Sequence, residues 1–182
     1  MRVDKLRKMN ACQIALNWTA KQRSIDSAYG RCDNGSWLLW LAKKVKVDDH
    51  LIAMACYRIV DIIYEITKED YELRWALSNL KMYAEGERSE NQLVSIKKRI
   101  ADYLFESNGK NVIYVNAVLN ALHLHDLLVY YVAKSFTTYL DILDDYSEDG
   151  CKIVDFVYKR SADICREVFG DELPDKYRKY KP

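Results

Sequence analysis

The segment Leu122-His123-Leu124-His125-Asp126 contains the residue types that most directly suggest metal chemistry. An adjacent His-Asp pair, joined by another His and a later Asp, is the pattern of HD-type metal-dependent phosphohydrolases. On a helix, however, His123 and His125 would point about 200° apart, so the two rings could not bind one ion together. Further ligands would have to come from distant positions, namely His50 and Asp141 or Asp144. We therefore predict buried or interface histidines and no metal site, and keep the phosphohydrolase as the alternative.

Other catalytic motifs are missing from the sequence. It contains no Walker loop, dinucleotide fingerprint or HExxH zinc motif, and no Ser, Cys or Lys stands in a context that identifies an activated nucleophile. We predict a protein that is not an enzyme and that needs no cofactor.

Tyrosine is the residue type that points most clearly to binding. The chain has 14 Tyr among 182 residues, and Tyr is favoured at binding surfaces because its large, rigid ring carries a polar tip. Many of them follow Asn108, on both sides of an acidic segment at 141–149 that suits a solvated helix end or, alternatively, a cation or a basic protein surface. We predict a partner surface built by Tyr114, Tyr130, Tyr131, Lys134, Tyr139, Tyr146, Tyr158, Lys159 and Arg160.

Composition and charge narrow the class of protein. Hydrophobic residues make up 49% and charged residues 30%, and the net charge is +1, which gives no strong field for nucleic acid or an anionic membrane. The N-terminus lacks the apolar core of a signal peptide, and the apolar stretch at 111–133 carries Asn, His and Asp that favour a buried helix over a membrane span. Five Cys without a CxxC pair suggest reduced thiols. We predict a cytoplasmic protein.

Helical periodicity is the dominant structural signal, while Gly and Pro, with six and two residues, are few. We predict one compact all-α domain of about seven helices over residues 1–173, followed by an exposed basic and aromatic tail at 174–182. The expected helices span roughly 4–19, 37–42, 48–66, 67–85, 89–106, 111–145 with a bend near 135–138, and 152–169, and a short helical turn is expected at 24–29.

Turn and cap residues set the expected boundaries of these helices. Asn34, Gly35 and Ser36 offer turn and cap chemistry immediately before the helix at 37–42. Helix N-caps are predicted at Asp48, Thr67 and Ser89, the last forming a capping box with Gln92. Glycines that tolerate a left-handed conformation are expected to end helices at Gly86 and Gly170.

The four tryptophans are expected to be structural. Trp37 and Trp40 are three residues apart, so they share one helix face and bury a large area together. The Gly-bearing turn before them could instead bind an anion through its free backbone N–H groups. We predict core positions, in or beside the hydrophobic core, for Trp18, Trp37, Trp40 and Trp75.

Four segments stand out in the first half of the chain, namely Ala11-Cys12-Gln13-Ile14-Ala15-Leu16-Asn17-Trp18, Cys32-Asp33-Asn34-Gly35-Ser36-Trp37-Leu38-Leu39-Trp40-Leu41-Ala42, Ala55-Cys56-Tyr57-Arg58 and Asn79-Leu80-Lys81-Met82-Tyr83-Ala84-Glu85-Gly86. These segments resemble a helical family of immunity proteins that occurs in bacterial polymorphic-toxin loci and in phage genomes. The resemblance covers roughly residues 11–100. The second half of the chain lacks the alanine-rich helices typical of many relatives, which is why we expect the partner surface after Asn108.

This resemblance implies a cytosolic binding protein that neutralises an antagonist by sequestration. The antagonist would be a protein toxin, a protein of host defence, or a small nucleotide signal bound by aromatic stacking and basic phosphate contacts. The alternatives are the phosphohydrolase and a phage structural or scaffolding protein. A homo-oligomer stays open as well.

Overall fold

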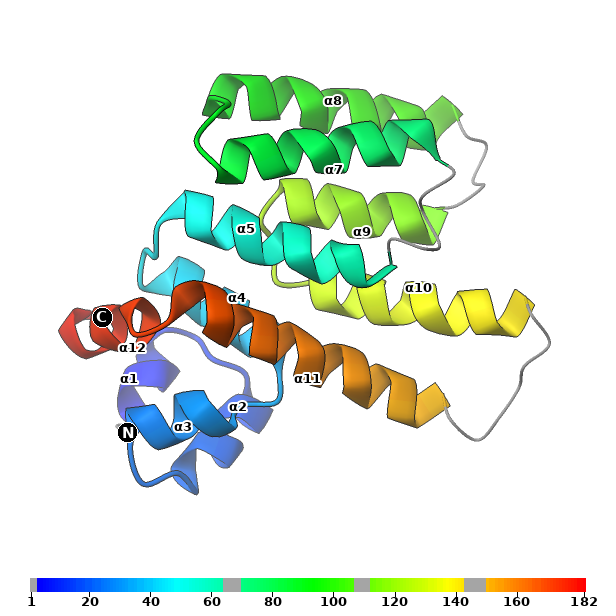
Figure 1. The fold of residues 1–182 in the computed structure, drawn as a ribbon. Coiled ribbons are helices and arrows are strands. Elements are labelled where there is room, and N and C mark those ends of the chain that lie inside the picture. The colour runs from blue at the N-terminus through cyan, green and yellow to red at the C-terminus, as the bar shows by residue number, and fades with distance from the viewer. Residues whose placement is uncertain (1–2, 64–69, 107–111, 143–149) are drawn as a thin grey trace.

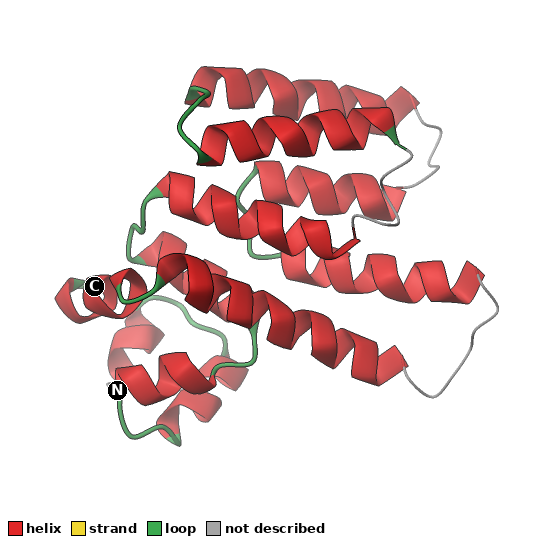
Figure 2. Ribbon diagram, in the orientation of Figure 1, coloured by secondary structure: helices red, strands yellow, loops and turns green. Residues whose placement is uncertain are grey.

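The computed structural model describes residues 3–63, 70–106, 112–142 and 150–182. These residues form eleven α-helices and one 3-10 helix, and no strand occurs among them (Figure 2). The prediction of an all-α fold is confirmed. The elements are α1 (Val3–Lys8), α2 (Gln13–Ala20), α3 (Ile25–Arg31), α4 (Gly35–Lys44), α5 (Asp49–Val60), η1 (Asp61–Ile63), α7 (Tyr71–Ala84), α8 (Glu90–Glu106), α9 (Val112–Leu122), α10 (Leu128–Ile142), α11 (Gly150–Phe169) and α12 (Glu172–Lys179).

Helix α5 lies at the centre of the molecule (Figure 1). It packs against α7 and α9 on one side and against α10 and α11 on the other. Helix α8 covers the outer side of α7, while α1, α2, α3 and α12 gather at the opposite end, next to α4. Apolar residues at three- and four-residue spacing explain the central position of α5, because its buried side chains are Ile52, Ala53, Ala55, Cys56, Ile59 and Val60.

The expected number of about seven helices is too low, and each extra helix has a local cause. The helix expected at 4–19 is interrupted at Asn10, which has a φ of 63°. The helix expected at 111–145 is interrupted at residues 123–127, where Leu124 has a φ of 52°, and not at 135–138. A further helix, α12, occupies most of the region expected to be a tail.

The region after residue 173 is folded against the rest of the chain, contrary to the expectation of an exposed tail. Leu173 and Tyr177 lie four residues apart on α12 and are both buried. The Lys5 ammonium donates a hydrogen bond to the Tyr177 carbonyl and lies 4.3 Å from the centroid of its ring. The basic residues of α12 stand in its last turn, where their positive charges interact favourably with the negative end of the helix dipole.

Most of the predicted helix boundaries are confirmed. The side chains of Asn34 and Asp48 accept hydrogen bonds from the Trp37 and His50 amides at 3.1 and 2.9 Å. The Ser89 amide donates to Gln92 at 2.8 Å, as in a capping box. Thr67 lies outside the described residues. The N-cap of α7 is Asp70, which sequence analysis missed.

The C-terminal glycine signals are also confirmed. Helix α7 ends just before Gly86, which has a φ of 79°, and α11 ends before Gly170, which has a φ of 48°. Glycine adopts this left-handed conformation without the steric cost of a Cβ atom. Among the described helices, none is both long enough and apolar enough to cross a membrane.

Candidate binding pocket

An apolar cavity of about 300 Å³ lies where the N-terminal helices meet α4. Its walls come from α1 to α4, from the start of α12 and from the turn before α10. Three of the four tryptophans line it, together with one tyrosine, and apolar side chains such as Leu6, Leu38 and Leu41 complete the wall. The aromatic lining residues are Trp18, Tyr29, Trp37 and Trp40.

Two short helices set the positions of the three indole rings. Trp37 and Trp40 stand one turn apart on α4, whose start is fixed by the Asn34 cap. Trp18 comes from α2 and meets Trp37 edge to face, with ring centroids 5.9 Å apart and ring planes at 60°. The two rings therefore form a corner of the cavity.

The pocket has few polar groups. Among the described lining residues Asp126 is the one charged residue, and none of them is Lys, Arg or His. The small uncharged polar residues of this lining are Asn10, Cys12, Thr19, Cys32 and Ser36. The Asp126 side chain is 32% exposed and lies 3.3 Å from Nδ1 of His125. The Leu127 amide donates to the same nitrogen at 3.1 Å.

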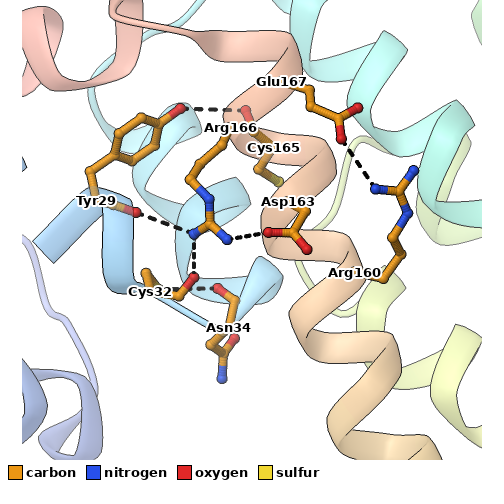
Figure 3. Close-up of polar contacts among 8 residues, drawn as sticks. All are labelled: Tyr29, Cys32, Asn34, Arg160, Asp163, Cys165, Arg166 and Glu167. Atoms are coloured by element: carbon orange, nitrogen blue, oxygen red, sulfur yellow. Dashed lines mark hydrogen bonds and ion pairs between the residues drawn. The ribbon is translucent and has the colours of Figure 1, made fainter.

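One arginine holds the α3 wall of the pocket against α11 (Figure 3). The Arg166 guanidinium donates to the carbonyl oxygens of Tyr29 and Cys32 at 3.3 and 2.6 Å, and it pairs with Asp163 on its own helix. Both carbonyls belong to the C-terminal end of α3, where the Cys32 amide also donates to the Tyr29 carbonyl at 3.5 Å. The Tyr29 hydroxyl lies 3.5 Å from the Cys165 carbonyl, to which it donates.

Burial keeps the ionisable groups of this wall neutral. Desolvation is the main reason that the pKa of the Tyr29 hydroxyl is raised, and it also raises the pKa of the Cys32 thiol to about 11. The α3 wall of the pocket therefore carries no charge from these two side chains near neutral pH.

The structure brings part of the predicted tyrosine surface together. Tyr130 and Tyr131 meet edge to face at 5.2 Å, and the Lys134 ammonium lies 5.9 Å from the Tyr130 ring centroid. Tyr158 on α11 is partly buried; its pKa is raised mainly by this burial and further by the charge of Tyr130. Tyr131 and Tyr158 also pack against the core, so Tyr130 and Lys134 are the exposed members of this group.

The other residues of the predicted surface do not belong to this group or lie outside the described residues. Tyr114 is partly buried against the core on α9, and Lys159 is exposed on α11. Arg160 donates to Glu167 at 3.1 Å. Arg58 also binds Glu167, and its hydrogen bond is the main reason that the pKa of this carboxyl is lowered. The Tyr139 side chain and Tyr146 lie outside the described residues.

The histidines do not form the arrangement of a phosphohydrolase in the described structure. His50 stacks on Tyr83 with ring centroids 4.8 Å apart, and its Nδ1 lies 2.6 Å from the Tyr83 carbonyl. His125 and Asp126 occupy the turn between α9 and α10. Within the described residues, no group of three or more His, Cys, Asp or Glu is placed to hold a metal ion. The Asp141 side chain and Asp144 are outside the description.

The pocket tryptophans are the residues whose role sequence analysis missed. Trp18, Trp37, Trp40 and Trp75 all pack beside the core, as expected, but all four are only partly buried. The expected spacing of Trp37 and Trp40 on one helix face is present. What that spacing does not reveal is that the neighbouring helices leave a cavity in front of the face.

Comparison with known proteins gives no relative for this chain. No protein-family model matches it, no curated protein matches it, and no solved structure matches it.

Proposed function

We propose that this chain is a non-enzymatic binding protein that acts by sequestering its target, and that the aromatic pocket holds the target's apolar part. The observation that carries this proposal is the cavity of about 300 Å³ with three indole rings in its wall. Ligand sites are typically concave and mostly apolar, with a few polar groups that orient the ligand, and their volumes begin near this size. The partly exposed indole rings supply the contact area.

The residues that resemble immunity proteins support the same site. Two of the resembling segments, at 11–18 and 32–42, contribute more than half of the pocket lining. In this proposal, these residues contact the ligand as well as their neighbours in the fold. Their lining members are Ala11, Cys12, Ala15, Trp18, Cys32, Ser36, Trp37, Leu38, Trp40 and Leu41.

We further propose that the target is an antagonist, as the resemblance implies. A nucleotide signal is the weaker of the two target classes for this pocket. Its phosphates need Arg, Lys or backbone N–H donors, whereas Asp126 is the only charged residue in the part of the lining that the structure describes. A small apolar molecule, or an apolar side chain of a protein, fits the lining better.

The test is capture from a lysate of the host cell, followed by mass spectrometry of both proteins and small molecules. Ala15 lines the cavity on α2, whereas Ala20 on the same helix is exposed. Ala15→Phe should fill the cavity and abolish capture, while Ala20→Phe should retain it. Unchanged capture by Ala15→Phe, with an unchanged melting temperature, would place binding outside the pocket. Absence of any captured species would remove sequestration as the function.

A further inference from the structure

The charge of the pocket favours a positively charged ligand. Among the described residues of the lining, Asp126 is the single charged one, and the others are apolar, aromatic or uncharged. A carboxylate beside an apolar cavity acts through a lower effective dielectric constant than one in bulk water, so it attracts a cation more strongly there. It repels phosphate and carboxylate groups for the same reason.

The aromatic rings act in the same direction. The face of an indole ring carries negative potential, and Trp is the strongest aromatic partner for ammonium and guanidinium groups. Trp18 and Trp37 meet edge to face, and both residues belong to the lining of the pocket.

The chain already uses its other tryptophans in this way. The Arg99 guanidinium lies 4.3 Å from the centroid of Trp75, and the Lys44 ammonium lies 5.9 Å from that of Trp40. In the part of the chain that the structure describes, no Lys or Arg lies over the rings of Trp18 or Trp37. Trp18, Trp37 and Asp126 all belong to the lining of the pocket.

From this combination we propose that the pocket binds a small organic cation with an alkylated ammonium group. The inference rests on the proposed binding role of the pocket and adds the class of ligand. A metal ion would need several oxygen, nitrogen or sulfur ligands around one point, and within the described residues no three His, Cys, Asp or Glu side chains are placed to hold one. A cationic side chain of a protein would need a wider exposed apolar surface around the pocket. Among the exposed large hydrophobic residues described, only Ile14 and Leu127 belong to segments that line the pocket.

Choline and its neutral isostere 3,3-dimethylbutan-1-ol test the proposal, because they have the same shape and differ in charge. Each is titrated into the full chain while tryptophan fluorescence is recorded, with sodium chloride as the control for ionic strength. Choline should give a saturable change with a Kd about tenfold lower than that of the alcohol, as expected for cation–π and carboxylate attraction in a partly desolvated site. Equal binding of the two, tighter binding of the alcohol, or no binding of choline would overturn the proposal.

Two variants assign the effect to the pocket. Asp126→Asn keeps the shape of the side chain and should raise the Kd of choline at least fivefold, about 1 kcal/mol, while the Kd of the alcohol stays within twofold. Asp155→Asn changes an exposed residue of α11 and should alter neither the Kd of choline nor that of the alcohol. An unchanged Kd of choline in Asp126→Asn would overturn the assignment.

The failure of this inference can be separated from the failure of the proposed function. If the alcohol binds as well as choline and Ala15→Phe abolishes both, the pocket is a binding site and only the charge of the ligand is wrong. If choline releases captured protein, the cation in the pocket is a side chain of that protein, and the proposal of a small-molecule ligand is overturned.

Discussion

Gly35 sets the distance between α4 and α11. A Cβ atom at this position would lie 2.4 Å from the Cβ of Ser161 and 2.8 Å from its backbone carbonyl carbon. A backbone atom cannot move aside as the end of a flexible side chain can, so any larger residue forces the two helices apart. Sequence analysis assigned this glycine to a turn, whereas its role is the close approach of two helices.

Gly35→Ala should therefore lower the free energy of unfolding by about 1 to 3 kcal/mol, the usual cost of overpacking. The measurement is urea denaturation followed by circular dichroism. Gly30→Ala is the matched control, because a Cβ atom there meets nothing within 4 Å. Alanine is the better helix former, so Gly30→Ala should be neutral or more stable by up to about 1 kcal/mol. Equal stability of Gly35→Ala and the wild type would contradict the close approach.

The thiols should differ sharply in reactivity. Cys12 is exposed at the N-cap of α2, while Cys32, Cys56 and Cys165 are buried. Burial is the main reason that the pKa of each buried thiol is raised, to about 11 for Cys32 and about 12 for Cys56. The thiolate is the reactive form, so these three should resist alkylation both through inaccessibility and through protonation.

Iodoacetamide at pH 8, followed by peptide mass spectrometry, should modify Cys12 first. The Cys151→Ser variant removes the one cysteine whose side chain lies outside the described residues. The three buried thiols should react only when denaturant is added. Rapid alkylation of Cys56 in the absence of denaturant would mean that the central helix is more accessible than the structure indicates.

Arg166 connects two elements, and its removal should loosen α3. A hydrogen bond from a charged group typically contributes about 1.5 to 3 kcal/mol to the free energy of unfolding. Because the Arg166 side chain is 20% exposed, solvent weakens its hydrogen bonds. We therefore expect Arg166→Met to lower the free energy of unfolding by about 1 to 3 kcal/mol. Arg160→Met is the control, because its partner Glu167 keeps Arg58 and exposed ion pairs contribute about 0 to 1 kcal/mol. Thermal denaturation of both variants checks the difference. A loss of stability no larger than that of Arg160→Met would show that α3 does not depend on this arginine.

At the scale of elements, the sequence predicted several of the boundaries that use side-chain caps or glycine, but not the Asp70 cap of α7. Asn34, Asp48 and Gly86 carry their signal in their residue type. The break after α9 carries no such signal, because a leucine takes the left-handed position that glycine usually occupies. Leu124 is 8% exposed, and the His125 amide closes the turn on the Asn120 carbonyl at 2.8 Å. Burial of this side chain and the closing hydrogen bond compensate for a conformation that local preference disfavours.

The pocket was harder to predict than the fold. Helical periodicity shows which face of α4 is apolar, but not how closely α2 and α3 approach that face. The cavity is lined by residues as distant in sequence as Leu6, Trp37 and Leu173. The predicted tyrosine surface rests on residue type alone. Several of its residues are instead partly buried and pack against the core.

Buried side chains are unevenly distributed over the whole molecule. Helix α5 buries six of its twelve residues, whereas α1 and α3 bury one residue each and α2 buries two. Regions with few buried apolar contacts open locally at a lower free energy than the core does. The pocket lies on the border between these two parts, where α1, α2 and α3 meet α4.

Hydrogen exchange should reveal this difference. Backbone amides of α5 and α9 should exchange most slowly, near the rate set by global unfolding, while amides of α2 and α3 should exchange faster through local opening. A ligand that binds only the closed pocket must slow that opening, since it stabilises the state to which it binds. Saturating choline should therefore slow exchange in α2, α3 and the first turn of α4 and leave α7 and α8 unchanged. Uniform slowing over all helices would indicate that the N-terminal helices open only with the whole molecule, and that ligand entry needs no local opening.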